Sequence, residues 1–489
     1  MISFQNLEVQ PYTIEQLFDV HINHQVNEHS TLYFRGLLSD ELKDSYVKDS
    51  SEGSNVSLLV RNSDGKKESL FEGMVQDVEV KVIQELYYIE VLAVSYSCLL
   101  DMEKKSRSFQ DKKLSYTDLM HQVAESYENA AVDDVITGGR ELGQLIVQYN
   151  ETDWEFLKRL ASHFYTGLIP DAHFGSQRLF FGVPNKGSLT LQTPYYHVKK
   201  QMGRYLKLSK NGVSGVREQD FIYYLVESYL PADIGDKVAF QGQSLYVYQV
   251  EARIEKGILL YYLTLTTKKG MSQLYKWHDG LAGSSLSARI AEVQNDRVKV
   301  IMEIDEEAGH NPGKPCFFPY STIYSSKDGS GWYCMPEIGD CVRIYFPDGV
   351  EDHSYAISSV HEEVEISQEG SRNDYGVGTR SSAGSAYSGQ RDDPSVKSLR
   401  NQDGKEIRLT PGGIYIIADG TMISLTDEDG ISMISDQNIA LKSDQNIILS
   451  ADQNIDIVGN LGIDLSCNET ASIKIEEDVK VTGQEVKSN

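Results

Sequence analysis

From residue 404 onward, apolar residues recur in pairs with a period of eight. The residue between the two members of a pair is mostly polar, which is the alternation of a strand with one buried face. All twenty pair positions are apolar in a chain that is 40% hydrophobic, so the pattern is not accidental. Besides Ala471, the predicted core positions are Ile407, Leu409, Tyr415, Ile417, Ile423, Leu425, Ile431, Met433, Ile439, Leu441, Ile447, Leu449, Ile455, Ile457, Ile463, Leu465, Ile473, Val479 and Val481.

A second class of residue marks the corners between these short strands. Gly, Asp or Asn stands three positions before most pairs, and these residues tolerate left-handed turn conformations best. The predicted corners are Gly404, Gly412, Gly420, Asp436, Asp444, Asp452, Asn460 and Asn468. A calcium ladder along the recurring aspartates is the less economical interpretation, because Asp and Asn fill turns routinely.

A single chain of such octads cannot enclose a core. Burying the pairs contributes roughly 30–60 kcal/mol, whereas fixing the backbone of the octads costs about 80–160 kcal/mol. Open strand edges would also favour aggregation. Winding identical chains around a common axis closes the edges and points every pair inward. Residues 404–489 are therefore predicted to form an intertwined β-helical needle, most simply a homotrimer.

Residues 1–280 combine strand alternation with two amphipathic helices. One helix is predicted after Ser115, and another begins at the capping box of Thr152 and Glu155. Alternating aliphatic and tyrosine-rich segments predict strands at 32–38, 86–92, 221–225, 245–250 and 259–263. We predict two β-barrel domains with helical inserts in this region.

Residues 281–362 predict a compact β unit. Segments 287–293 and 298–302 are expected to pair across 294–296, and two further strands flank the turn at 347–349. Short strands at this spacing fit a small Greek-key barrel of the OB type. Residues 363–403, rich in Ser, Gly, Arg and Asp, predict a linker. The predicted fold class is therefore mainly β: two barrels, an OB-fold barrel and a trimeric β-helix.

Charge and composition narrow the classes of function. The net charge of −26 in 489 residues would become −78 in a trimer (3 × −26), which disfavours nucleic acid and anionic lipid as resting partners. The chain has no run of 18 apolar residues and begins without the basic and apolar regions of a signal peptide. Five scattered cysteines suggest reduced thiols, so we expect synthesis in the cytoplasm.

Three groups of residues are candidates for chemical sites. The histidine spacing fits no standard zinc pattern, so ordinary surface or core histidines are expected. No Cys-x-x-Cys is present, so the cysteines are expected to be buried free thiols rather than metal ligands. The acidic run is expected to be a solvated loop rather than a glycosidase pair. The groups are His21, His24 and His29; Cys316, Cys334, Cys341, His310 and His353; and Asp305, Glu306 and Glu307. Phosphate-binding glycine loops and nucleophile elbows are absent from the sequence. No catalytic residue, metal or cofactor is predicted.

Several motifs together resemble one family. The segment 147–161 (VQYNETDWEFLKRLA) is similar to a hallmark of VgrG proteins, the trimeric spikes of type VI secretion and related contractile injection systems. Segments 105–110 (KSRSFQ) and 336–342 (PEIGDCV) match the same family's first domain and OB barrel. Residues 393–400 (DPSVKSLR) resemble its entry to the needle. The order of hub, OB barrel, linker and needle covers essentially the whole chain.

The resemblance implies a non-enzymatic structural spike. Residues 1–280 would form a threefold hub that docks a hexameric inner tube and baseplate components, and contraction of a sheath would drive the needle through a target membrane. Because no histidine follows His361, the needle would end bluntly and accept a separate PAAR-type tip protein or effectors. The protein would be assembled into an injection particle and delivered outward.

The sequence leaves two other classes of function open. A trimeric phage-tail fibre or adhesin would use the octads as a shaft, but it should carry a receptor-binding head. A cell-wall-degrading enzyme would use the needle as a trimerising segment, but the 40 or so residues before the needle are too few for the lysozyme domain of some phage spikes.

Overall fold

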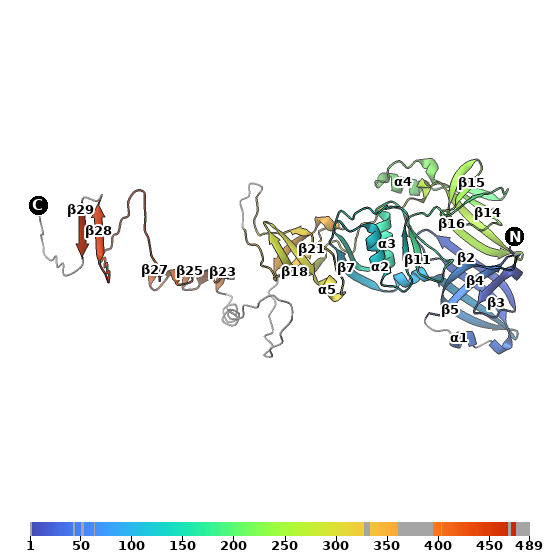
Figure 1. Ribbon diagram of the computed structural model, residues 1–489, viewed down its shortest axis with the longest axis horizontal. Coiled ribbons are helices and arrows are strands. Elements are labelled where there is room, and N and C mark those ends of the chain that lie inside the picture. The colour runs from blue at the N-terminus through green and yellow to red at the C-terminus, as the bar shows by residue number, and fades with distance from the viewer. Residues whose placement is uncertain are drawn as a thin grey trace. The chain divides into compact units, whose positions relative to one another are not determined.

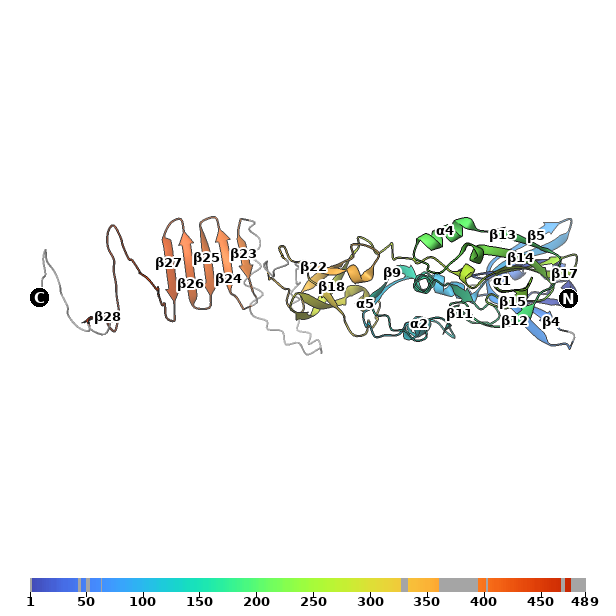
Figure 2. The same ribbon diagram turned by 90° about the horizontal axis from the view of Figure 1, so that it is seen from above.

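The computed structural model describes residues 2–42, 45–49, 53–62, 64–326, 333–359, 395–401, 403–467 and 471–475. The chain divides into two compact units, Met1–Glu365 and Ile366–Asn489, each taken by itself below (Figures 1 and 2). Strands dominate both units, so the predicted mainly β fold class is confirmed.

Twelve strands of the first unit form one continuous sheet. The first half has the spatial order β1 (Leu7–Gln10), β4 (Asn55–Arg61), β5 (Lys67–Ile83), β6 (Leu86–Ser95), β3 (Thr31–Leu38) and β2 (Gln16–Gln25). The second half continues as β16 (Gln243–Glu255), β17 (Ile258–Thr266), β14 (Ile222–Ser228) and β13 (Tyr196–Lys200), with β15 (Lys237–Phe240) beside β16 and β12 (Ser188–Thr190) beside β15. Antiparallel pairing of β2 with β16, with Gln25 opposite Gln249, joins the halves. The two barrels predicted from the sequence are here two halves of one sheet.

A shared apolar core holds the two halves together. In β3, buried side chains alternate with partly exposed ones along the whole strand, as the sequence pattern predicts. Phe34 and Val91 from the first half lie in the same cluster as Val226 and Leu263 from the second, and all four are at most 1% exposed. Every second residue of these strands therefore faces the core, as the alternation of apolar residues in the sequence predicts.

Both predicted helices are confirmed. Ser115 accepts a hydrogen bond from the backbone N–H of Asp118 at the start of α2, and Thr152 and Glu155 form the capping box of α3. The described helices are α1 (Ser45–Asp49), α2 (Tyr116–Ala124), α3 (Asp153–Ser162), α4 (Met202–Lys210) and α5 (Glu303–Glu307). Short 3₁₀ turns lie at η1 (Phe4–Asn6), η2 (Asp40–Leu42), η3 (Tyr96–Asp101), η4 (Glu218–Phe221), η5 (Lys269–Met271) and η6 (Glu351–His353). Sequence reasoning missed α4 because Leu208 is its one buried residue.

Helices α2 and α3 belong to a small α/β segment that lies, in the sequence, between the strands of the first half and those of the second half of the large sheet. Its strands are the antiparallel pair β7 (Lys104–Phe109) and β9 (Ile146–Thr152), and a sheet in the order β10 (Leu168–Pro170), β11 (Arg178–Phe181) and β8 (Ala131–Asp134). Leu119 of α2 and Leu157 of α3 pack with Phe181 in a core of their own.

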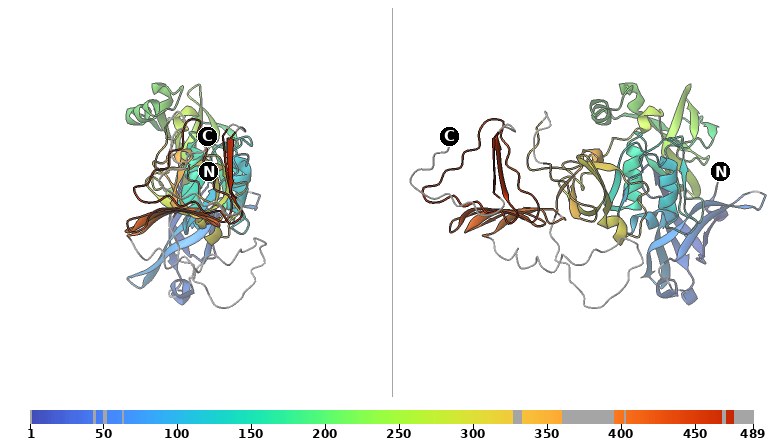
Figure 3. Two further views of the ribbon diagram at one scale, coloured as in Figure 1. Left: turned by 90° about the vertical axis from the view of Figure 1, so that its left-hand side faces the viewer. Right: turned by 60° about the vertical axis from the view of Figure 1, so that its left-hand side comes forward.

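The remaining strands of the first unit form a separate antiparallel sheet. Its order is β20 (Phe317–Pro319), β19 (Arg297–Met302), β18 (Ser285–Gln294), β21 (Cys341–Tyr345) and β22 (Tyr355–Ser359). A parallel bridge between Tyr320 and Ala356 brings the two edges together, and Figure 3 shows these yellow strands curling round. Val147 of β9 shares the core of this sheet, which fastens it to the α/β segment. The assignment to the OB type stays a prediction.

The second unit contains an antiparallel meander and a hairpin. The meander runs β23 (Lys397–Arg400), β24 (Glu406–Thr410), β25 (Gly413–Ala418), β26 (Thr421–Thr426) and β27 (Gly430–Ser435), and the hairpin is β28 (Ile463–Cys467) with β29 (Ala471–Ile475). The predicted corners Gly404, Gly412 and Gly420 lie at the turns between strands, and Gly404 and Gly420 have positive φ. The intertwined winding requires further chains and stays a prediction.

The C-terminal strands begin earlier in the chain than the sequence pattern predicts. Part of the predicted linker is a strand, because β23 pairs with β24, so the meander begins at Lys397 rather than at 404. Most of the remaining linker, together with Asn468, Val479 and Val481, lies outside the described residues. The chain bends at Asp436, Asp444, Asp452 and Asn460, the positions proposed as corners.

The second octad presents a different pair from the one predicted. Ile407 lies opposite Ile416, and Ile416 lies opposite Ile423, so these three side chains share a face. Tyr415 and Ile417 are on the other face. The turns at 411–412 and 419–420 contain two residues each, so residues that face each other across these hairpins are separated by an odd number of positions. Residues eight positions apart across such a turn therefore lie on opposite faces of the sheet. Because residues 414–417 are all apolar, the sequence alone did not reveal this shift.

Candidate functional sites: a buried ionic junction and an uncovered apolar face

A buried aspartate organises the first site. Asp153, the first residue of α3, is 0% exposed. Its carboxylate accepts hydrogen bonds from Arg107 Nη2 at 2.6 Å, Lys105 Nζ at 2.8 Å, Tyr127 Oη at 2.7 Å and Gln148 Nε2 at 3.0 Å. Burial opposes the charge, but Arg107 and these hydrogen bonds hold the pKa of Asp153 below its usual value. The carboxylate also lies at the positive end of the helix.

A buried arginine continues the network toward the five-stranded sheet. Arg159 of α3 is 3% exposed and donates to Glu151, to the carbonyl of Val147 at 2.7 Å and to Glu351 at 2.9 Å. Glu351 lies in η6, between β21 and β22, so this ion pair ties α3 to that sheet. Burial raises the pKa of Glu351, while Arg159 opposes this shift. The guanidinium compensates two carboxylates that are largely removed from water.

A third buried contact ties α5 to β7. The carboxylate of Asp305 accepts hydrogen bonds from Ser108 N and Ser108 Oγ, both at 2.6 Å, and His310 Nε2 lies 2.9 Å from the carbonyl oxygen of Ser108. The expectation that Asp305 lies in a solvated loop is therefore wrong, since Asp305 is 1% exposed and helical. Glu306 and Glu307, its neighbours, are exposed as expected.

The protonation of Asp305 makes this contact sensitive to pH. Burial raises its pKa to about 6, against the opposing effect of the hydrogen bonds from Ser108. The ordinary value in an unfolded chain is about 3.9. Because the folded state holds the proton more tightly, the group adds stability that is fully present below about pH 4 and is lost as the pH rises through 6.

Replacing Asp305 with asparagine is expected to remove this dependence. Between pH 4 and pH 7 the wild type should lose about 2–3 kcal/mol of unfolding free energy relative to the variant, the equivalent of the pKa shift. Urea unfolding across this pH range measures the difference. Glu306→Gln removes a charge from the exposed face of the same helix and is the matched control. A difference between wild type and Asp305→Asn that does not change with pH would contradict the assignment.

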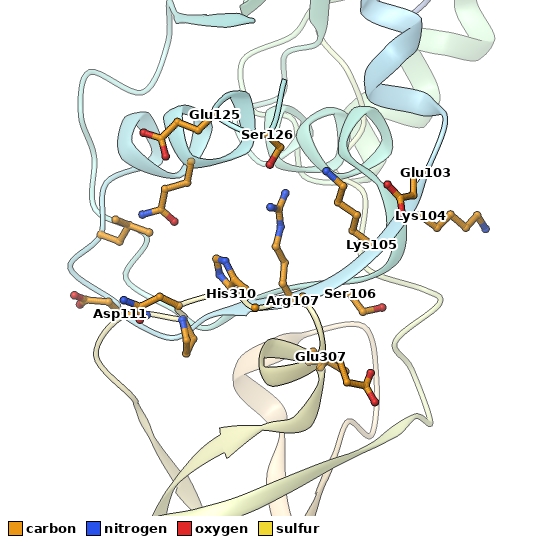
Figure 4. A pocket seen from close by; sticks show the side chains of 18 residues that line it. Glu103, Lys104, Lys105, Ser106, Arg107, Asp111, Glu125, Ser126, Glu307 and His310 are labelled. Carbon is orange, nitrogen blue, oxygen red and sulfur yellow. Dashed lines mark hydrogen bonds between the residues drawn. The ribbon is translucent and has the colours of Figure 1, made fainter. Parts of the chain in front are cut away.

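An open cavity of about 770 Å³ lies beside these contacts, between the α/β segment and α5. Figure 4 shows Lys105, Arg107 and His310 directed toward it, with Glu125 and Glu307 at its rim. Lys105 and Arg107 are already compensated by Asp153, and His310 contacts Ser108. These three groups of the cavity therefore serve the junction between the two segments.

The three N-terminal histidines do not converge on a common point. His24 contacts Ser30 at 2.6 Å, His21 contacts Glu251 at 3.0 Å, and His29 contacts Ser97 at 2.8 Å. Each ring therefore has a local partner, as ordinary core and surface histidines do. Within the described ranges, no three His, Cys, Asp or Glu side chains are grouped to hold a metal ion.

The cysteines of the five-stranded sheet region are free thiols, as expected. The expectation that they are buried is wrong for Cys334, which is exposed, and Cys316 and Cys341 are only partly buried. Burial raises the pKa of Cys316 to about 11, so its thiol stays protonated near neutral pH.

The second candidate site is an apolar face of the meander without cover in the single chain. Ile431 is 70% exposed and Met433 is 53% exposed, and the same face continues through the other strands. Its members are Ile407, Leu409, Ile414, Ile416, Ile423, Leu425, Ile431 and Met433. Further along the chain, Leu441 and Leu449 are about two-thirds exposed. So large an apolar surface is typical of a protein interface.

The opposite face of the meander mixes polar side chains with Tyr415, Ile417, Met422 and Ile434. Glu406 and Arg408 form an ion pair at 2.7 Å, and Ser424 lies between strands on the same side. Glu406 and Ser424 are only 6% exposed, so in the single chain this face is less accessible to water than the apolar face. The two faces therefore differ both in composition and in exposure.

Comparisons with known proteins identify the type of fold. The family model described as phage tail baseplate hub (GPD) matches residues 41–164, and no curated protein matches the chain. A chain of the lidded Francisella PdpA–VgrG complex superposes with a TM-score of 0.51 at 10% identity, covering 86% of this chain and 76% of that one.

Two other solved structures are similar over smaller parts of the chain. The Escherichia coli c3393 protein, a component of the type VI secretion system, has 12% identity and a TM-score of 0.49, with 73% of this chain and 99% of that one covered. A prophage tail protein from Shewanella oneidensis has 13% identity and a TM-score of 0.41, with 55% and 98% covered.

The resemblance to VgrG-like hub and spike proteins is confirmed at the level of the fold. The structure also explains the motif that carried it: Glu151, Asp153 and Arg159 of segment 147–161 are the ionic residues of the junction. Sequence reasoning missed their partners Arg107 and Glu351. The available signal was the presence of charged residues within the apolar helical pattern of α3, which indicates buried ionic partners elsewhere in the chain.

Proposed function

We propose that this VgrG-like chain is the subunit of a homotrimeric hub and spike in a contractile injection particle. The supporting observation is the octad series, whose apolar face is uncovered in the single chain. Burying the exposed half of eight such side chains contributes roughly 6–12 kcal/mol per chain. Three chains around one axis would cover this face and close the strand edges.

The first unit is suited to the role of the hub. Residues 41–164 of this large β assembly match a baseplate-hub model, and the two halves of its sheet would give a trimer six similar positions for a hexameric inner tube. The ionic junction would hold the five-stranded sheet rigidly to the hub when the spike is pushed. Within the described residues, no helix is long and apolar enough to span a membrane.

The C-terminal unit would puncture the target membrane. A closed β needle pairs its backbone polar groups internally, so it can enter hydrocarbon without exposing unpaired groups. Its end would receive a PAAR-type tip protein or effectors. The force would come from a contracting sheath, and the role proposed here is structural, without catalysis.

Light scattering of the purified chain tests the proposal. Full-length protein is expected to have a mass near three times the 54.9 kDa of one chain. A chain ending at residue 394, which lacks the meander and everything after it, should dissociate to monomers at micromolar concentration. A stable full-length monomer would overturn the spike proposal. Release of sugar from purified peptidoglycan would overturn the non-catalytic role.

A further inference from the structure

A basic pocket lies on the first unit, next to the ionic junction. It has a volume of about 540 Å³ and lies between α3, α4 and the segment 272–276. Its charged lining residues are all cationic: Lys158 of α3, Arg204 and Lys207 of α4, and Lys276. No carboxylate lines it, although the whole chain carries a net charge of −26. Concentrated positive charge in so acidic a chain needs a specific explanation.

Within the described residues, the lysines of this pocket have no direct ion-pair partner, although Glu28, Glu155 and Glu151 are near enough to stabilise the charge of Lys276. In the described part of the chain, Lys158, Lys207 and Lys276 form no ion pair within 4 Å. Arg204 donates to Tyr248 Oη at 2.8 Å and to the carbonyl of Ser272 at 2.9 Å, so neutral acceptors fix its position and leave its charge available. Burial and the nearby charge of Lys158 lower the pKa of Lys276.

The start of α4 adds to the attraction for anions. The side chain of Gln201, the residue before the helix, does not cap it. Gly203 lies in the first turn and lines the pocket, and a side chain there would meet no atom within 4 Å. The backbone N–H groups of a first turn carry partial positive charge and lack partners within the helix. Helix and side chains therefore favour the same kind of ligand.

The pocket also has an apolar component. Leu274 lines it and is partly exposed, and Leu206 and Met202 of α4, outside the lining, are 46% and 37% exposed. A small polyanion such as phosphate would contact the cations and leave these side chains uncovered. A peptide that combines carboxylates with an apolar side chain would satisfy both parts of the surface.

We propose that this pocket is a docking site for a short acidic segment of a partner protein, with its carboxylates on the four cations and an apolar side chain against Leu274. The pocket residues all belong to the first unit and are distinct from the apolar face of the meander. The proposal therefore goes beyond assembly of the spike and does not depend on it.

Fluorescence anisotropy on the full chain tests this site. The probe is a labelled peptide Glu-Glu-Leu-Leu-Glu-Glu, compared with Gln-Gln-Leu-Leu-Gln-Gln and Glu-Glu-Ser-Ser-Glu-Glu. We expect saturable binding of the first peptide, at least tenfold weaker binding of the other two, and weakening with added salt. Inorganic phosphate should compete only poorly.

Matched variants locate the binding. Lys158→Gln/Lys276→Gln should weaken binding at least tenfold, whereas Lys66→Gln/Lys237→Gln, which removes the same charge outside the pocket, should leave it unchanged. Lys207→Gln, on the exposed rim, provides an independent second variant, and thermal unfolding confirms that each variant is folded. The proposal is overturned by absence of saturable binding, by equal binding of the serine peptide, or by indifference to the pocket substitutions. None of these results bears on the mass measured for the trimer.

Discussion

Replacing Arg159 with methionine is expected to lower the free energy of unfolding by about 3–5 kcal/mol, the usual cost of breaking a buried ion pair. The substitution keeps most of the side-chain volume but removes the charge that compensates Glu151 and Glu351. Their side chains are 15% and 5% exposed, so water cannot replace the guanidinium. Urea unfolding followed by the fluorescence of Trp154, which is buried on the same helix, measures the loss.

An exposed ion pair of similar geometry is the matched control. Arg178 and Asp133 lie 2.9 Å apart, but both side chains are more than one-third exposed. Arg178→Met should therefore cost less than about 1 kcal/mol. Adding Glu351→Gln to Arg159→Met should restore part of the stability, because one unpaired carboxylate is removed. Equal, small losses for Arg159→Met and Arg178→Met would show that the junction contributes no special stability.

A single charge on the uncovered face of the meander is expected to abolish assembly. Ile416→Asp places a carboxylate between Ile407 and Ile423, in the centre of the face that the trimer would bury. Three such charges around one axis would be desolvated and would repel one another. Light scattering should then report a monomer, where the wild type is expected to be a trimer.

The adjacent residue supplies a control with the same chemistry. Ile417 lies on the opposite face, beside the ion pair of Glu406 and Arg408, so Ile417→Asp should leave the trimer intact. The two variants differ by one position in the chain and have the same composition. If Ile417→Asp dissociated the trimer and Ile416→Asp did not, the face that carries Ile417 would be the buried one. The second octad would then present Tyr415 and Ile417 to the core, as the sequence pattern predicts.

Part of the fold around the candidate site could be predicted from residues close together in the sequence. The caps of α2 and α3 depend on residues within four positions of each other, and both appear where Ser115 and Thr152 predict them. The strand alternation of β3 similarly reflects a period of two that any single strand displays. The same local reasoning gave the wrong prediction for Asp305. A run of acidic residues is expected to be exposed to water unless a distant hydrogen-bond partner, here Ser108, is known.

The sequence by itself determined the mainly β class, the periods of strands and helices, the octad series and its corners, because these follow from neighbouring residues and from the conformational preferences of each side chain. Only the tertiary structure decided the pairing of β2 with β16, the partners of Asp153 and Arg159, and the side on which the second octad lies. Each of these depends on contacts between segments far apart in the chain or on the parity of a turn. A local hydrophobic pattern carries no information about which distant charge or strand it will meet.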